Sequence, residues 1–148
     1  MGKRKYITKI RVDDPYWARA AMVAHWAAGL IDKQGFTRGN FAANQYGRKT
    51  SPLSPEAFLY SLEGSLMAAA RKYKMEKDIY IQHITAPLKE WMVGKGIIGP
   101  NDRPQTWSDN ECDDAQDCIN LLRAFAKHMS QKHARWNGYR LPGKKKAA

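Results

Sequence analysis

Apolar residues recur at spacings of three and four positions along much of this chain, and this pattern predicts helices. The first predicted helix runs from about Pro15 to Lys33. Acidic residues and a proline at its start, and Gly35 just after its end, are typical helix boundaries. Its apolar face contains small residues that permit close packing and comprises Trp17, Ala21, Ala24, Ala28 and Ile31.

A second helix is predicted to start at Ser54, Pro55 and Glu56, because serine caps helices and proline fits a first turn. Gly64 falls inside this helix, where glycine costs about 1 kcal/mol relative to alanine. Small neighbouring residues strengthen the inference that another backbone comes close to Gly64. The predicted apolar stripe comprises Phe58, Leu59, Leu62, Leu66 and Ala69.

Residues 75–93 also show helical spacing, but Pro87 interrupts it, so we expect two short helices or one bent helix. The last helix is predicted to follow Trp107, Ser108 and Asp109, with an acidic start that suits the positive end of its dipole. Its apolar stripe comprises Ala115, Cys118, Ile119, Leu122, Phe125, Ala126 and Met129.

Two further segments complete the predicted fold. Residues 5–12 are rich in β-branched residues and predict a short N-terminal strand or extended arm. Residues 35–54 form a connection longer than most, rich in aromatic residues and glycine, and we expect it to be ordered. The sequence therefore predicts a mainly α single domain of four to five helices with a short N-terminal strand and basic terminal arms.

Positive charge concentrates in the two ends of the chain. Residues 1–12 and 131–148 contain no acid, and their eleven Lys and Arg residues equal the whole formal net charge of +11. The helical domain, residues 13–130, is therefore neutral overall. Basic arms of this kind suit a polyanion, because each cation near a phosphate releases condensed counterions.

The C-terminal arm also interleaves cations with aromatic residues, a combination that binds phosphates and stacks on unpaired bases. The alternatives are that Trp136 and Tyr139 pack back onto the domain, or that the arms bind a protein or another acidic surface. Under the nucleic-acid hypothesis, which includes both DNA and RNA, the contact residues are Lys3, Arg4, Lys5, Lys9, Arg11, Lys132, Arg135, Trp136, Tyr139, Arg140, Lys144, Lys145 and Lys146.

The long connection offers a second candidate site for an anion. Arg38, Arg48 and Lys49 lie ahead of the second predicted helix, whose free N–H groups would help to hold a phosphate. A small anionic ligand under this loop, held by Arg38, Tyr46 and Arg48, is a related hypothesis. The loop lacks the glycine-rich phosphate motifs, so a solvated loop that covers the helices is the favoured interpretation.

Other chemistry has little support in the sequence. His25, His83, His128 and His133 are scattered, so we expect no metal site and no cofactor. The acids of residues 109–117 are interpreted as a stabilised helix start, and no spacing identifies an activated nucleophile, so we expect no enzyme. Cys112 and Cys118 are placed about 240° apart on one helix, where they cannot pair. We expect a cytoplasmic protein without a membrane contact, because no apolar stretch is long enough to span a bilayer.

Several short motifs resemble a known family. They are Gly35, Phe36 and Gly39, then Asn44 to Arg48, Leu62-Glu63-Gly64-Ser65-Leu66, and Trp107-Ser108-Asp109. The chain resembles a small helical domain of unknown function found in phages and actinobacteria, over about residues 16–127. It departs from that family's pattern at Phe36, Ser65 and Ser108. The resemblance implies a helical fold and a phage context, and it transfers no catalytic residue.

Taken together, these patterns favour a non-enzymatic, phage-encoded accessory protein that binds nucleic acid through its basic arms. The alternative is a protein that binds a host protein and inhibits or redirects it. The sequence is consistent with DNA and with RNA, with any degree of sequence specificity and with any oligomeric state.

Overall fold

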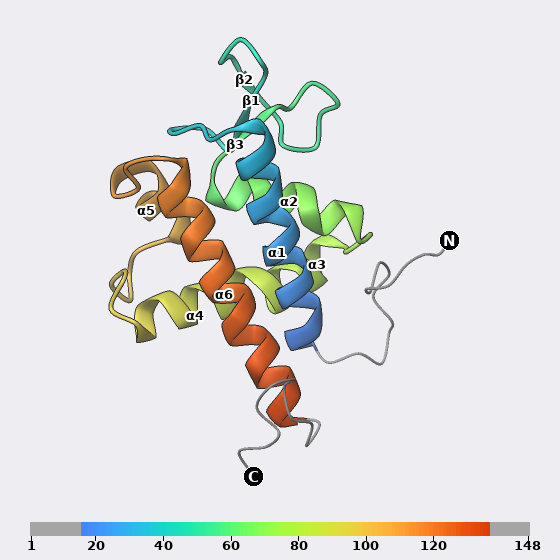
Figure 1. The fold of residues 1–148 in the computed structure, drawn as a ribbon, viewed down its shortest axis with the longest axis vertical. Coiled ribbons are helices and arrows are strands. Elements are labelled where there is room, and N and C mark those ends of the chain that lie inside the picture. The colour runs from blue at the N-terminus through green and yellow to red at the C-terminus, as the bar shows by residue number, and fades with distance from the viewer. Residues whose placement is uncertain (1–15, 137–148) are drawn as a thin grey trace.

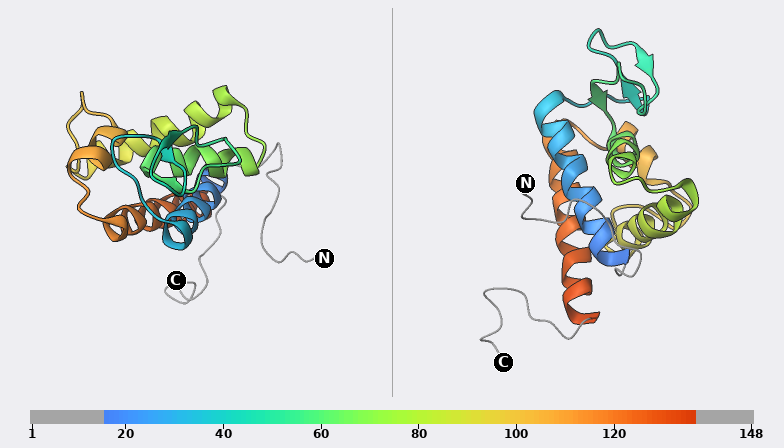
Figure 2. Two further views of the ribbon diagram at one scale, coloured as in Figure 1. Left: turned by 90° about the horizontal axis from the view of Figure 1, so that it is seen from above. Right: turned by 90° about the vertical axis from the view of Figure 1, so that its right-hand side faces the viewer.

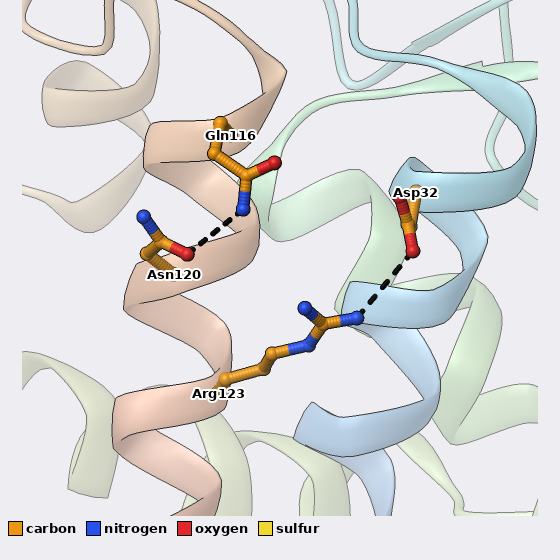
Figure 3. A network of polar contacts seen from close by, with 4 residues as sticks. All are labelled: Asp32, Gln116, Asn120 and Arg123. Carbon is orange, nitrogen blue, oxygen red and sulfur yellow. Dashed lines mark hydrogen bonds and ion pairs between the residues drawn. The ribbon is translucent and has the colours of Figure 1, made fainter.

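Two long helices, α1 (Tyr16–Gln34) and α6 (Ala115–Trp136), lie side by side and antiparallel in the computed structural model, which describes residues 16–136 (Figure 1). Figure 3 shows one contact between them, an ion pair of 3.4 Å between Arg123 and Asp32. Both side chains are at least half exposed, and such pairs contribute only about 0–1 kcal/mol. The buried alanines of α1 and the buried Leu122 and Phe125 of α6 belong to one hydrophobic core, and burying such apolar surface stabilises the pair more than this contact does.

Helix α1 confirms the first prediction to within a residue at each end. Gly35 follows it with a φ of +127°, a conformation that favours glycine. The buried alanines are Ala20, Ala24, Ala27 and Ala28, and they allow the neighbouring helices to approach closely. Helix α6 is longer than predicted, since it continues through residues 131–136, which the sequence assigned to the C-terminal arm.

The bent helix predicted around Pro87 is confirmed. It consists of α3 (Lys77–Tyr80), a π-helical turn, η1 (Ile81–Thr85), and α4 (Ala86–Gly94). Pro87 lies in the first turn of α4, directly after the π turn. The wider turn accommodates a residue that cannot donate an N–H and whose ring would collide with a regular preceding turn.

The last predicted helix begins later than expected, and a separate short helix precedes it. Trp107 and Ser108 belong to α5 (Pro104–Asn110), and the chain turns over residues 111–114 before α6 begins. Asp114 accepts a hydrogen bond from Asp117 N at 3.2 Å, and Asp117 accepts one from Asp113 N at 2.9 Å. Acidic side chains therefore cap the start of α6, which agrees with the structural interpretation of this acidic stretch.

The predicted start of the second helix is wrong. Helix α2 (Leu62–Lys72) begins eight residues after Ser54, and the intervening chain includes β3 (Leu59–Tyr60). This strand pairs antiparallel with β1 (Ala42–Ala43), which also pairs with β2 (Lys49–Thr50) in the order β2-β1-β3. Phe58 and Leu59 fit a helical stripe, but Phe58 N donates to Ala43 O at 2.9 Å and Leu59 pairs with Ala43 in the sheet, so the chain is extended there.

With residues 77–94 counted as one bent helix, the described residues contain five helices, so the predicted mainly α fold class is confirmed. The small three-stranded sheet was not predicted. It lies at the end of the molecule where α1 ends and α6 begins (Figure 2). None of the described helices combines the length and the apolar character that crossing a membrane would require. The predicted strand at residues 5–12 lies outside the described residues.

Gly64 confirms the predicted close approach of two backbones. A Cβ atom added there would collide with the carbonyl oxygen of Phe41 and would lie 2.6 Å from its carbonyl carbon. The loop before β1 therefore presses directly onto the first turn of α2. Backbone atoms on both sides leave no flexible side chain that could move away.

We expect Gly64→Ala to lower the free energy of unfolding by about 3 kcal/mol or more, because overpacking against backbone costs at least as much as in a side-chain core. Gly29→Ala is the matched control, since nothing lies within 4 Å of a Cβ atom at that helical position. It should stabilise the protein by up to about 1 kcal/mol. Urea unfolding of both variants tests this, and equal stabilities would contradict the close approach.

Candidate functional site

Buried side chains accept hydrogen bonds from the first turn of α2. Its first three N–H groups each donate to a side chain: Leu62 N to Ser108 Oγ at 3.2 Å, Glu63 N to Gln105 Oε1 at 3.2 Å, and Gly64 N to Ser61 Oγ at 3.1 Å. Two of these acceptors come from α5. All three acceptor side chains are buried, so water cannot replace them.

Helices α2 and α5 cap each other. Gln105 Oε1 accepts from the first turn of α2, and in return Glu63 Oε2 accepts from Gln105 N, in the first turn of α5, at 3.0 Å. The arrangement resembles a capping box, except that its two halves lie on different helices. Pro104 precedes Gln105 and has no N–H, which leaves one donor fewer to satisfy.

The loop after α1 is fastened to the same region. Gly39 N donates to Asp109 Oδ1 at 2.9 Å, and Gln105 Nε2 donates to the same oxygen at 3.0 Å. Arg38 donates to the backbone carbonyls of Cys112 and Asp113. The three motif segments around Gly39, Gly64 and Ser108 therefore meet in one place, and their contacts are structural.

The predicted phosphate site in residues 35–54 loses two of its requirements. The N–H groups of the following helix already donate to side chains, and the Arg38 guanidinium is occupied by carbonyls beside α6. Arg48 and Lys49 are exposed on the β1–β2 hairpin. Tyr46, also exposed, lines a cavity of about 480 Å³ with Phe58, but neither Arg38 nor Arg48 lines it. The structure does not bring these three cations together around one pocket.

The predicted nucleic-acid contacts divide into two groups. The last turns of α6 include Lys132, Arg135 and Trp136. The other ten, which are Lys3, Arg4, Lys5, Lys9, Arg11, Tyr139, Arg140, Lys144, Lys145 and Lys146, lie outside the described residues.

Cys112 and Cys118 do not share a helix, which corrects the sequence prediction. Cys112 precedes α6, and the turn at residues 111–114 brings its thiol back to that of Cys118. The hydrogen bond between the two thiols lowers the pKa of Cys112 and raises that of Cys118, and burial raises the latter further. Cys112 Sγ in turn donates to Asp114 O at 3.2 Å, so this buried pair helps to shape the turn.

Glu63 is the most unusual ionisable group of this region. Its exposed fraction is 9%, and burial raises the pKa of its carboxyl above the usual value. The hydrogen bond from Gln105 N and the positive charge of Arg103 oppose that shift, while Asp109 adds to it. Sequence reasoning missed Glu63, because the predicted helix start at Ser54 placed it in a helix interior, where a glutamate looks like an ordinary solvated side chain.

Within residues 16–136, no group of three or more His, Cys, Asp or Glu side chains gathers in a way that would hold a metal ion. Comparisons with protein families, with curated proteins and with solved structures found no match for this chain. The resemblance drawn from the short motifs therefore stays a prediction.

Glu63→Gln tests the electrostatics of this site. The variant keeps an acceptor for Gln105 N and removes the carboxylate that burial disfavours. Because the folded-state pKa is raised, the contribution of Glu63 to stability is present at low pH and is lost as the pH rises through that pKa. We therefore expect the variant to match the wild type near about pH 4 and to have a higher Tm at about pH 7.

Glu56→Gln, which removes an exposed carboxylate, is the control, and its Tm difference should change less between the two pH values. A Glu63→Gln protein that is less stable than the wild type at about pH 7 would show that the charged carboxylate stabilises the fold.

Proposed function

We propose that this protein binds nucleic acid through its basic arms, residues 1–12 and 131–148, as a non-enzymatic accessory protein of phage origin. The arms contain eleven cations and no acid. The C-terminal arm adds Trp136 and Tyr139, whose rings can stack on unpaired bases. The helical domain acts in this proposal as the scaffold from which both arms start.

The antiparallel arrangement of α1 and α6 is the observation that supports the proposal most. Figures 1 and 2 show that α1 begins and α6 finishes at the same end of the domain. The Arg123–Asp32 pair, which joins the first half of α6 to the last turn of α1, agrees with this direction. Both arms therefore start from one end of the domain, and their cations can act on one nucleic-acid molecule rather than on two distant ones.

A host-protein-binding role is the second candidate, and one observation favours it. Of the large hydrophobic side chains exposed in the described residues, four lie in the sheet and its loops: Phe41, Tyr46, Leu53 and Phe58, with exposed fractions of 38%, 79%, 44% and 41%. Exposed aromatic residues are enriched at protein interfaces. This surface lies at the opposite end of the α1–α6 pair from the start of α1 and the end of α6 (Figure 1).

Binding to labelled single-stranded and duplex DNA and RNA over a salt series tests the first role. If about eight cations contact duplex phosphates, log K should fall against log salt with a slope near −7. Replacing Lys3, Arg4, Lys5, Lys9 and Arg11 together by glutamine should make that slope shallower by about 4 to 5, and replacing Lys144, Lys145 and Lys146 by about 3.

Lys33, Lys77 and Lys95 provide a matched control, since all three are exposed lysines of the helical domain. Their replacement by glutamine should leave the slope unchanged. If the Lys144/Lys145/Lys146 variant and this control lost equal amounts of slope, binding would respond to net charge alone. A partner protein that remains bound at high salt and to both arm variants, but not to a Tyr46→Ser/Phe58→Ser protein, would favour the second role.

A further inference from the structure

A cleft of about 620 Å³ lies where η1 and α4 face α2 and the start of α5. Its walls are largely apolar and include Ile81, Val93, Pro100 and Pro104. Ile81 is 43% exposed, unusual for a large aliphatic side chain. The volume falls within the range of about 300–1,000 Å³ that small-molecule sites occupy. The π-helical turn forms part of the wall, and such turns are frequent at functional sites.

A largely buried glutamate contributes its carboxylate to the lining of the cleft. Glu63 lines it, and among the described residues Gln105 N is the only group that donates to this carboxylate, through Oε2. Oε1 accepts no hydrogen bond from residues 16–136, and no salt bridge neutralises the group within that range. A buried carboxylate in this position favours a ligand that brings an N–H donor with positive charge.

Two cations also line the cleft. Lys89 and Arg103 stand beside Glu63 and the more exposed Glu90, so the formal charges of the lining cancel. Lys89 and Arg103 would repel a purely cationic ligand, and Glu63 and Glu90 would repel a purely anionic ligand. Only a ligand that carries both charges can pair with each set.

We propose that this cleft binds a small zwitterion with an apolar side group, the chemistry of an apolar α-amino acid. Its ammonium group donates to Glu63 Oε1, its carboxylate faces Arg103 and Lys89, and its side group contacts Ile81 and Val93. The site is independent of the basic arms, so its failure would leave the nucleic-acid proposal unaffected.

Three compounds that share a phenylethyl group separate the contributions to binding. L-phenylalanine has both charges, 2-phenylethylamine lacks the carboxylate, and 3-phenylpropionate lacks the ammonium group. Titration of the full-length protein, followed by chemical shifts of the cleft residues, should give a Kd of about 1 mM for L-phenylalanine. Each of the other two compounds should bind about tenfold more weakly or worse, because it loses one charge-assisted contact.

Two variants test the residues. Glu63→Gln should weaken L-phenylalanine binding about tenfold and leave 3-phenylpropionate nearly unchanged, and Arg103→Gln should weaken both compounds. Lys33→Gln, on α1 and away from the cleft lining, should alter neither. Each variant's Tm shows that it is folded. No shift of cleft residues with any compound, or 3-phenylpropionate binding as tightly as L-phenylalanine, would overturn the proposal.

Discussion

The buried start of α2 is the constraint on which the rest of the fold depends. The first N–H groups of a helix have no partner within the helix, and buried N–H groups without partners destabilise a protein by roughly 1–3 kcal/mol each. Here Gly64 allows the carbonyl of Phe41 to pack directly on this turn, which excludes water from it. Protein groups must then accept hydrogen bonds from these N–H groups, and the acceptors are the side chains of Ser61, Gln105 and Ser108.

This requirement connects segments that are distant in the chain. Gln105 and Ser108 tie α5 to α2, and Asp109 ties the loop after α1 to α5 through Gly39 N. The loop after α1, the first turn of α2 and the Trp107-Ser108-Asp109 segment are thus parts of one hydrogen-bonded junction. The same junction buries Glu63, and the carboxylate of this residue also lines the cleft.

The two proposed binding regions follow from different parts of this architecture. The antiparallel α1–α6 pair puts the first residue of α1 and the last residue of α6 at the same end of the domain. The cleft depends on the bent helix at Pro87 and on the α2–α5 junction, and it uses none of the arm residues. Polyanion binding by the arms and small-ligand binding by the domain are therefore separable properties of one chain.

Local sequence determined the helices whose signals lie within a few residues of one another. The α1 boundaries, the bend at Pro87 and the acidic start of α6 depend on spacings of three and four, on proline geometry and on helix dipoles, all of which can be read from neighbours. The concentration of cations in the arms is likewise a property of the sequence itself. The sequence predicted that another backbone comes close to Gly64, but it did not identify Phe41 as the residue that does so.

Only the tertiary structure decided the features that depend on residues far apart in the chain. Leu59 fits a helical stripe, yet pairing with residues 42 and 43 places it and Tyr60 in a strand. The turn before α6 brings Cys112 to Cys118, against a helical wheel that separates them. Glu63 gained its unusual pKa only when α5, about 40 residues further along, removed it from water. Burial and desolvation depend on which surfaces meet, and spacing along the chain does not specify that.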